Sequence, residues 1–442
     1  MKVKFLTLGC KVNQYESQAM LEGLLAQGFQ GAGENEEADV AVVNSCTVTA
    51  QSDQKARQAL RRLKRQNPQA VIVVTGCWSQ AFPAEAAALP EADIVLGNAN
   101  RSSLGDRILE YLSTKQRIVD VAPHSQGETF EPMRVKGLSG HTRAFLKIED
   151  GCNRFCAYCI IPYARGRVRS KPLASLRAEV EGLAAGGYRE VVLTGINLPA
   201  YGQELGLTLC DAIEAACEAE GILRVRLGSL EPERLTPEVI ARMKLQPKLC
   251  PQFHLSLQSG CDATLKRMNR KYTCREYEAR CSLLRRYFLH PAITTDVIVG
   301  FPQETEEEFE ATREFLKRIS FFGMHIFKYS MRKGTRAAQM PGQVPEEAKA
   351  RRSEVLFADA APMNQSFLEW YLNREVEVLL EEKVSIGGKE YFLGHTKEYV
   401  KAALPLEGIQ TPDLGNQIIK ARAKSLLGKD MLSLVPGCQQ NG

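Results

Sequence analysis

The stretch DGCNRFCAYCIIPYARGRVRS, residues 150–170, places three cysteines within eight positions, at Cys152, Cys156 and Cys159. We call these three residues the barrel triplet. They follow the apolar run 144–148, which has the composition of a buried β-strand. A loop at a strand end can bring three thiolates to one metal centre. The stretch therefore predicts a strand that ends here and a metal site built on the following loop.

Five more strand-like runs follow, and most of them are succeeded by a stretch with helical periodicity. Series of βα units predict a parallel α/β architecture, here an open, partial (β/α)6 barrel whose active site collects at the carboxyl ends of the strands. A single glycine after a strand is more often a turn residue than part of a site, but glycine or polar residues follow all six runs. The runs are 144–148, 190–193, 223–227, 253–257, 293–299 and 324–328.

The first part of the chain repeats one pattern, an apolar strand-like run followed by a cysteine. Cys10, Cys46 and Cys77 close the sequences LTLGC, VVNSC and VVTGC, and helical stretches separate them. We call these residues the amino-terminal triplet. The alternation predicts a doubly wound parallel sheet, in which ligands bind at the carboxyl edge. One such cysteine alone is more often a buried small side chain, but three at equivalent strand ends favour a shared site.

From about residue 370 the sequence changes to short strand candidates separated by turn-forming residues, which predicts a small β-barrel. A polar stretch with several prolines and glycines predicts a linker before the α/β barrel. We therefore expect a doubly wound α/β domain, a linker, a partial barrel and a terminal β-barrel. Their expected ranges are 1–122, 123–141, 142–366 and 367–436.

Bulk composition places the chain among ordinary soluble proteins of more than one domain. The net charge of +5 over 442 residues is too small to argue for an anionic partner by itself. Thirteen cysteines, an odd number without a framework spacing, argue against a disulfide scaffold. The first apolar run is too short for a signal peptide, and no run approaches a membrane span. We expect a cytoplasmic protein without a membrane partner.

Iron–sulfur and zinc are the two candidates for the barrel triplet, because thiolates suit both. Structural zinc sites close with a fourth ligand nearby, whereas here His141 lies on the linker side and the next cysteine is Cys210. Three ligands without a local fourth leave an iron with an open coordination position, which favours a catalytic cluster. A purely structural loop of three cysteines is the least favoured of the three interpretations.

The barrel triplet, with Tyr158 directly before its last cysteine, resembles the signature of the radical S-adenosylmethionine superfamily. Together with LGCKVNQYES, VVNSCTVT and VTGCWSQ upstream, it resembles the methylthiotransferases over nearly the whole chain. The resemblance implies a [4Fe–4S] cluster on the barrel triplet, where S-adenosylmethionine is cleaved to a 5′-deoxyadenosyl radical. It also implies a second [4Fe–4S] cluster on the amino-terminal triplet, whose free iron carries the sulfur to be transferred.

Within that family, KVNQ at 11–14 and IIPYARG at 160–166 resemble the tRNA-modifying branch, and the terminal barrel resembles its RNA-binding TRAM domain. The resemblance implies methylthiolation of C2 of N6-threonylcarbamoyladenosine at position 37 of tRNA, beside the anticodon, with two S-adenosylmethionine molecules per turnover. The expected partners are tRNA and an electron donor such as flavodoxin or ferredoxin. The alternatives are methylthiolation of an aspartate of a ribosomal protein, action on isopentenyladenosine-37 of tRNA, and a non-catalytic zinc- and RNA-binding protein.

Two further sets of residues carry expected contacts. Residues on the barrel rim are expected to bind the cofactor, although polar residues there also cap helices. They are Tyr158, Gly195, Asn197, Ser229, Glu231 and Gln258. Basic residues beside the barrel triplet and on a predicted terminal strand are expected to contact RNA, although a basic run is often only a solvated face. They are Arg165, Arg167, Arg169 and Lys171, and Lys420, Arg422 and Lys424.

Overall fold

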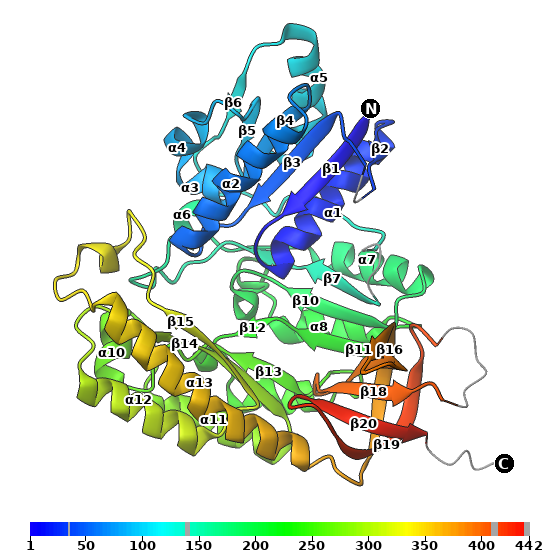
Figure 1. Cartoon of the computed structure of the whole chain (residues 1–442), viewed down its shortest axis with the longest axis vertical. Coiled ribbons are helices and arrows are strands. Elements are labelled where there is room, and N and C mark those ends of the chain that lie inside the picture. The colour runs from blue at the N-terminus through cyan, green and yellow to red at the C-terminus, as the bar shows by residue number, and fades with distance from the viewer. Residues whose placement is uncertain (34–35, 138–141, 408–413, 437–442) are drawn as a thin grey trace.

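The computed structural model describes residues 1–33, 36–137, 142–407 and 414–436, so His141 and Cys438 lie outside the described residues. Three units follow one another along the chain (Figure 1). The amino-terminal sheet lies above the partial barrel, and the terminal β-barrel packs beside the latter. In the described part of the chain, no helix has both the length and the apolar character needed to cross a membrane.

The amino-terminal unit is a parallel sheet of six strands in the order β2-β1-β3-β4-β5-β6. After β1 the chain runs to the edge strand β2 and returns on the other side as β3, which is the switch of a doubly wound fold and confirms that prediction. The short edge strands β2 and β6 had not been expected. The strands are β1 Lys2–Thr7, β2 Gln30–Gly31, β3 Val40–Ser45, β4 Val71–Gly76, β5 Ile94–Leu96 and β6 Ile118–Asp120.

Helices cover both faces of this sheet, which explains why β3 and β4 are buried along their whole length. Helices α1 (Lys11–Ala26) and α5 (Leu104–Thr114) share one core with the partial barrel. Helices α2 (Ala50–Gln66), α3 (Cys77–Ala81) and α4 (Pro83–Ala87) cover the other face and form a separate core. The shared core holds the first two units together as one packed body.

The partial barrel contains the six expected strands, all parallel, in two sheets with the orders β11-β10-β7 and β12-β13-β14-β15. An isolated bridge links Val225 of β11 to Leu249, which precedes β13, and the barrel stays open, as expected. The expected strands are β7 Arg143–Lys147, β10 Glu190–Thr194, β11 Arg224–Leu227, β13 Gln252–Leu255, β14 Ala292–Val299 and β15 Gly323–Lys328, and the short strands are β8 Glu149–Asp150, β9 Arg169–Ser170 and β12 Ser229–Leu230.

Helices follow most of the barrel strands and cover its outside (Figure 1). Three of them begin at a threonine whose side chain forms a capping box with the acidic residue three positions later, which fixes where these helices start. The helices are α6 Ile161–Arg165, α7 Leu173–Ala185, α8 Leu209–Glu218, α9 Pro237–Lys244, α10 Asp262–Arg267, α11 Cys274–Tyr287, α12 Glu306–Ile319 and α13 Glu346–Glu369.

The terminal unit is a closed β-barrel in the strand order β16-β17-β18-β20-β19, with a core of its own. It docks on the partial barrel through Arg224 and Arg226 of β11, which donate to the carbonyl oxygens of His395 and Lys397, each at 2.9 Å. The small terminal β-barrel expected from the sequence is therefore confirmed. Its strands are β16 Glu375–Ile386, β17 Lys389–Thr396, β18 Lys401–Pro405, β19 Ile418–Leu427 and β20 Met431–Pro436.

Candidate metal-cluster and substrate site

The amino-terminal triplet gathers at the carboxyl edge of the first sheet. Cys10 is the N-cap of α1, Cys46 follows β3, and Cys77 begins α3 directly after β4. Gly9 brings the first two together, because a Cβ built on it would lie only 3.2 Å from Cys46 Sγ. Burial is the main cause that raises the pKa of the Cys77 thiol to about 12. Arg165 opposes this shift, and the thiolates of Cys46 and Cys10 contribute to it. The three sulfurs are thus within electrostatic reach of one another.

Arg165 reaches from the loop after the barrel triplet into the amino-terminal site. Its Nε donates to Cys77 Sγ at 3.1 Å, and its Nη2 donates to Asn13 Oδ1 at 2.7 Å. Asn13 Oδ1 in turn lies 3.8 Å from Cys10 Sγ. The Arg165 side chain is fully buried. A cationic donor at this position offsets the negative charge that cysteinate ligands would concentrate there.

Glu16 of α1 is the centre of a buried set of charges that joins the first sheet to the barrel. Its Oε1 lies 2.6 Å from Arg101 Nη1 and 2.7 Å from Lys147 Nζ, and it also pairs with Arg165. Burial by itself raises the pKa of the Glu16 carboxyl, but Arg101, Arg165 and Lys147 together lower it to about 2. The carboxylate is therefore charged and fully compensated.

The barrel triplet occupies the loop that begins after β8. Gly151 turns the chain here with φ of +86°, and a Cβ on it would overlap the Arg167 carbonyl oxygen. Burial, together with a smaller contribution from the Cys156 thiolate, raises the pKa of the Cys152 thiol to about 12. Arg270 Nη1 donates to Cys156 Sγ at 3.4 Å. Each triplet thus has one buried arginine at one of its sulfurs.

The spacing of the sulfurs distinguishes between the two metals considered for these sites. Within the described residues, neither triplet has all three sulfurs within 4.8 Å of one another. Tetrahedral zinc with Zn–S bonds of about 2.3 Å would set its sulfurs about 3.8 Å apart. Cysteines that bind different irons of one cluster lie farther apart than ligands of a single ion. The sulfurs therefore do not have the spacing of ligands to a single zinc ion, and thiolates are the usual ligands of iron–sulfur clusters.

A cavity of about 710 Å³ connects the amino-terminal site with the barrel rim, because Cys10 and the rim residues Gly195 and Ser229 all line it. Gly195 packs on Glu149, since a Cβ on it would lie 2.6 Å from Glu149 Oε2. The same oxygen accepts from the Asn197 backbone N–H at 2.7 Å. Glu149 Oε1 and Asn197 Oδ1 are buried without a hydrogen-bond partner. These two atoms are available to a polar ligand beside the barrel triplet.

The other rim residues, Glu231, Tyr158 and Gln258, are buried or contact other side chains of the protein. Glu231 pairs with Arg270 and lies 3.7 Å from Arg154, so its carboxylate supports the arginine at Cys156. Tyr158 packs edge-on against Phe301 with ring centroids 6.4 Å apart. Gln258 is 8% exposed and adopts φ of +74°. None of the three lines the cavity in the way that Gly195 and Ser229 do.

The expected RNA-binding run beside the barrel triplet requires a correction. Arg165, Arg169 and Lys171 are buried, at 0%, 7% and 2% exposure. They take part in internal ion pairs, such as that of Lys171 with Glu179. Only Arg167 is exposed, over the Phe155 ring at 5.0 Å. The run of basic residues in the sequence does not show that these side chains form ion pairs with acidic residues far away in the chain.

The basic residues of the terminal barrel behave differently. Lys420, Arg422 and Lys424 are exposed on β19, and they alternate with the buried Ala421 and Ala423. The three cations therefore share the outer face of this strand, as the alternation predicted. Their contact with RNA stays a prediction.

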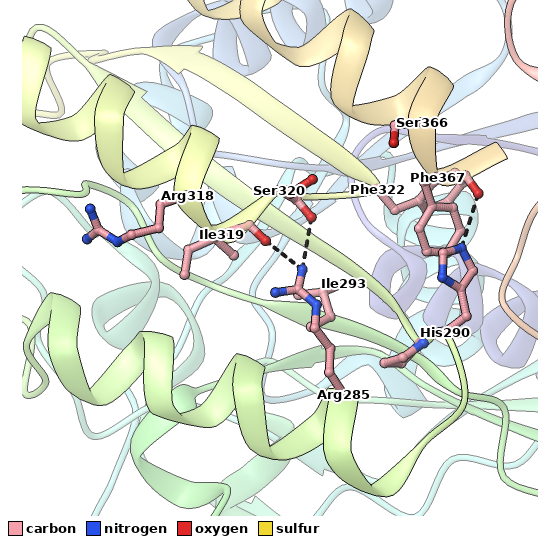
Figure 2. A pocket seen from close by; sticks show the side chains of 10 residues that line it. Arg285, His290, Ile293, Arg318, Ile319, Ser320, Phe322, Ser366 and Phe367 are labelled. Atoms are coloured by element: carbon pink, nitrogen blue, oxygen red, sulfur yellow. Dashed lines mark hydrogen bonds between the residues drawn. The ribbon is translucent and has the colours of Figure 1, made fainter. Parts of the chain in front are cut away.

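A second cavity, of about 420 Å³, is lined by residues from α11, α12 and α13 and from the segments before β14 and β15 (Figure 2). It is lined by Pro291 and Phe322, which directly precede β14 and β15. Its polar groups satisfy one another: Arg285 donates to the carbonyl oxygens of Ile319 and Ser320, and His290 bonds to that of Phe367. No residue of either cysteine triplet lines this cavity, so it is not the candidate site.

Several residues at these sites had not been expected from the sequence. Glu149 lies directly before the predicted metal loop, so its position at a strand end could have identified it as a site residue. Glu16 and Arg270 gave no such signal, because their partners are distant in sequence. Lys11 followed a predicted ligand and lines the same cavity. Their roles depend on contacts that only the folded chain creates.

Comparisons with known proteins agree with this architecture. Residues 2–97 match the uncharacterized protein family UPF0004, and residues 146–316 match the radical SAM superfamily. The threonylcarbamoyladenosine tRNA methylthiotransferase MtaB of Bacillus subtilis is 39% identical over 423 residues, which cover 95% of this chain and 93% of that protein. The MtaB protein of Thermotoga maritima is 37% identical, with coverage of 97% and 98%.

More distant relatives share the architecture. A tRNA-2-methylthio-N(6)-dimethylallyladenosine synthase of Pelotomaculum thermopropionicum is 32% identical and covers 99% of this chain and 96% of its own. Among solved structures, the radical S-adenosylmethionine methyltransferase TsrM of Kitasatospora setae superimposes with a TM-score of 0.56 at 14% identity. That match covers 76% of this chain and 74% of TsrM and shows the fold alone.

Radical SAM proteins use S-adenosylmethionine and a [4Fe–4S] cluster, and the matched residues 146–316 include the three cysteines of the barrel triplet. The relatives just described cover nearly the whole chain and nearly their own whole length. This chain belongs to the radical S-adenosylmethionine methylthiotransferase family, in the group that includes MtaB.

Proposed function

We propose that this chain transfers a methylthio group to C2 of N6-threonylcarbamoyladenosine at position 37 of tRNA, giving the 2-methylthio derivative. One observation carries the proposal: a single cavity is lined both by Cys10 of the amino-terminal triplet and by the rim of the barrel that bears the other triplet. A base held there would lie beside both Cys10 and the barrel rim. The MtaB relatives, 36–40% identical in four of the matches, are named for this reaction.

The proposal includes two [4Fe–4S] clusters, one on Cys152, Cys156 and Cys159 and one on the amino-terminal triplet. When bound, the first cluster with S-adenosylmethionine supplies a 5′-deoxyadenosyl radical, and the second supplies the sulfur that is transferred. Three cysteines at each site leave one iron of each cluster without a protein ligand, as both roles require. The electron that this chemistry consumes needs a donor protein, such as flavodoxin or ferredoxin.

The chain's own residues hold and compensate these sites. Arg165 at Cys77 and Arg270 at Cys156 each direct an N–H at a sulfur. Such contacts orient the ligands and favour the added electron of a reduced cluster. Glu149 Oε1 and Asn197 Oδ1 are positioned for polar groups of the cofactor, and Tyr158, Gly195, Ser229 and Gln258 complete the proposed rim. We assign Glu231 a supporting role through Arg270.

Lys11 favours threonylcarbamoyladenosine over dimethylallyladenosine. It lines the cavity directly beside Cys10. Among the described residues, no carboxylate lies within 4.0 Å of its ammonium group, whereas Arg226 of the same cavity is paired with Glu190 at 2.8 Å. The threonylcarbamoyl group carries a carboxylate and the dimethylallyl group carries no charge. A cation that lies over the Phe145 ring and has no carboxylate partner among the described residues therefore complements the first substrate only.

The proposed tRNA surface continues onto the terminal barrel, where Lys420, Arg422 and Lys424 share an exposed face. Phosphate contacts by such residues supply affinity without sequence readout. The residues of the cavity recognise the base itself, as is usual when an enzyme acts on a nucleotide in a single-stranded loop.

The test is nucleoside analysis with the reconstituted holoenzyme. Substrate tRNA from a strain lacking the gene is incubated anaerobically with enzyme, S-adenosylmethionine and dithionite, digested, and analysed by mass spectrometry. We expect 2-methylthio-N6-threonylcarbamoyladenosine with the native chain, none with Cys152→Ala, and undiminished product with Cys281→Ala, whose thiol is buried in α11. Modification of isopentenyladenosine, or of a ribosomal protein aspartate with tRNA unchanged, would overturn the substrate assignment.

Metal analysis provides the complementary test. A brown protein with about eight irons per chain supports two four-iron clusters. A colourless chain that carries zinc at the cysteines and binds tRNA without modifying it would instead support the non-catalytic interpretation.

A further inference from the structure

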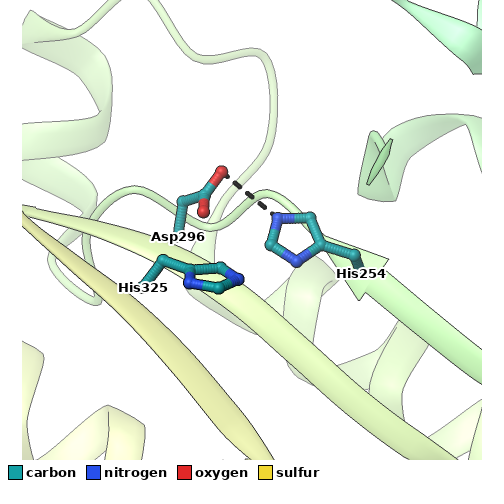
Figure 3. A group of neighbouring side chains, drawn as sticks. All are labelled: His254, Asp296 and His325. Atoms are coloured by element: carbon teal, nitrogen blue, oxygen red, sulfur yellow. Dashed lines mark ion pairs between the residues drawn. The ribbon is translucent and has the colours of Figure 1, made fainter. Parts of the chain in front are cut away.

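Three potential metal ligands converge inside the cavity from neighbouring strands of the barrel (Figure 3). His254 lies on β13, Asp296 on β14 and His325 on β15. The parallel register pairs His254 with Thr294 and Asp296 with His325. Because Thr294 and Asp296 are two positions apart on one strand, all these side chains lie on the same face of the sheet. We call His254, Asp296 and His325 the barrel triad.

The ligand atoms of the barrel triad are spaced for a single ion. One ligand atom from each residue lies within 4.8 Å of the other two. His254 Nε2 and Asp296 Oδ2 are 3.2 Å apart. Tetrahedral coordination with bonds of about 2.0–2.1 Å to nitrogen and oxygen places neighbouring ligand atoms about 3.3 Å apart. The barrel triad thus has nearly the ligand spacing of a single tetrahedral metal ion, whereas the sulfurs of both cysteine triplets lie too far apart for one.

The orientation of His254 is fixed by its other ring nitrogen. Nδ1 lies 3.0 Å from Thr294 Oγ1. A histidine protonated on Nδ1 donates to this hydroxyl and leaves the lone pair of Nε2 free for a cation held between it and Asp296. Histidine ligands of metals regularly donate their second ring nitrogen to an oxygen in this way. Thr294 therefore supplies the supporting hydrogen bond that a metal-binding His254 requires.

The cavity leaves room for further ligands, because the barrel triad shares it with Cys10, Gly195 and Ser229. His254 and Asp296 are partly buried, and His325 is exposed to the cavity space. Two histidines, one carboxylate and open positions are the donor set of catalytic zinc sites and of non-haem iron sites. The nitrogen and oxygen donors also distinguish this site from the thiolate sites for iron–sulfur clusters.

We propose that the barrel triad is a binding site for a first-row divalent cation such as Zn²⁺, with at least one coordination position open to the cavity. The site does not depend on the proposed function, because its three ligands belong to neither cysteine triplet. The competing interpretation is a hydrogen-bonded His254–Asp296 pair that shapes the cavity without a metal. Both interpretations predict a folded protein, so metal content distinguishes them.

The experiment uses the anaerobic holoenzyme with its iron sites loaded, dialysed against micromolar ZnCl2 and analysed for zinc and iron by mass spectrometry. We expect one more zinc per chain in the native protein than in His325→Ala, at equal iron content. His395→Gln is the matched control, because His395 lines the same cavity but bonds to Glu381 at 2.7 Å. It should keep the zinc. Thr294→Val should weaken zinc binding by about 10- to 100-fold through loss of the supporting hydrogen bond.

X-ray absorption at the zinc edge of the native protein decides the identity of the ligands. Nitrogen and oxygen at about 2.0–2.1 Å support the proposal, whereas a sulfur shell at about 2.3 Å would place the zinc on cysteines and overturn it. Equal zinc in the native protein and His325→Ala would overturn it as well. If His325→Ala loses iron, Asp296→Asn replaces it as the test variant. The absorption spectrum of the native protein tests the identity of the ligands independently of both variants.

Discussion

Replacing Arg165 with methionine tests whether the buried charges between the two metal sites hold the molecule together. The change removes a fully buried cation from Glu16, and it removes the donors to Asn13 and Cys77 at 2.7 and 3.1 Å. Methionine retains most of the apolar stem, so the cavity left behind is small. The main consequence is a loss of charge compensation where water cannot replace the guanidinium.

The expected loss of stability depends on the cations that stay beside Glu16 after the substitution. Removing one partner of a buried pair costs about 3–5 kcal/mol. Glu16 keeps two cationic neighbours, Arg101 at 2.6 Å and Lys147 at 2.7 Å, which places the expected loss near the lower limit, about 3 kcal/mol. At about 2 °C per kcal/mol for a unit of this size, the unfolding midpoint should fall by roughly 6 °C.

The assay is anaerobic scanning calorimetry of the holoenzyme, with iron content measured on the same samples. Arg167→Met is the matched control, because Arg167 lies two positions away on the same segment and is exposed. It should shift the midpoint by no more than about 1–2 °C, as is usual for surface substitutions. Arg165→Met should also lose iron from the amino-terminal site first. Equal midpoints for the two variants would refute the reasoning.

Three further changes address the other parts of the site. Cys46→Ala should lower iron from about eight to about four per chain, while 5′-deoxyadenosine is still formed from S-adenosylmethionine. Lys11→Met should raise the KM for tRNA carrying threonylcarbamoyladenosine by at least about tenfold with little change in kcat, because a charge-assisted hydrogen bond contributes about 1.5–3 kcal/mol. Replacing Lys420, Arg422 and Lys424 together with alanine should weaken tRNA binding and reduce the slope of log affinity against log salt by about 2–3, measured by filter binding.

Each of these has an outcome that contradicts it. Iron that stays near eight in Cys46→Ala, as it should in Cys281→Ala, would remove Cys46 from the ligand set. A Lys11→Met enzyme with unchanged KM would leave the preference for threonylcarbamoyladenosine without its proposed cause. An unchanged salt slope in the triple variant would show that tRNA does not contact this face of β19.

The general architecture could be read from local pattern, because strand–helix alternation, capping residues and turn residues act over short distances. The three units, the strands that carry the cysteines and the closed terminal barrel all follow from such signals. The short strands β2 and β6 were missed, since two or three residues carry too little periodicity. The alternation of Lys420, Arg422 and Lys424 also predicted their common face correctly, because strand periodicity alone decides it.

The burial or exposure of charged side chains could not be predicted from the local sequence pattern in the same way. The run from Arg165 to Lys171 has the composition of an exposed basic patch, yet three of its four cations are buried against acidic residues such as Glu16 and Glu179. The partners are separated by up to 149 positions in sequence, as in the pair of Arg165 and Glu16. A basic side chain is solvated or compensated according to what packs on it, and a linear pattern carries no information about that.

The sequence by itself determined the six cysteines, their spacing and the strand ends that bear them, because these are local and chemically distinctive. Only the tertiary structure decided that Cys10 and the barrel rim line one cavity, that Arg165 and Arg270 face cysteine sulfurs, and that His254, Asp296 and His325 meet in that cavity. The physical reason is that such convergence depends on the register and crossing of parallel strands, which bring distant residues to one face.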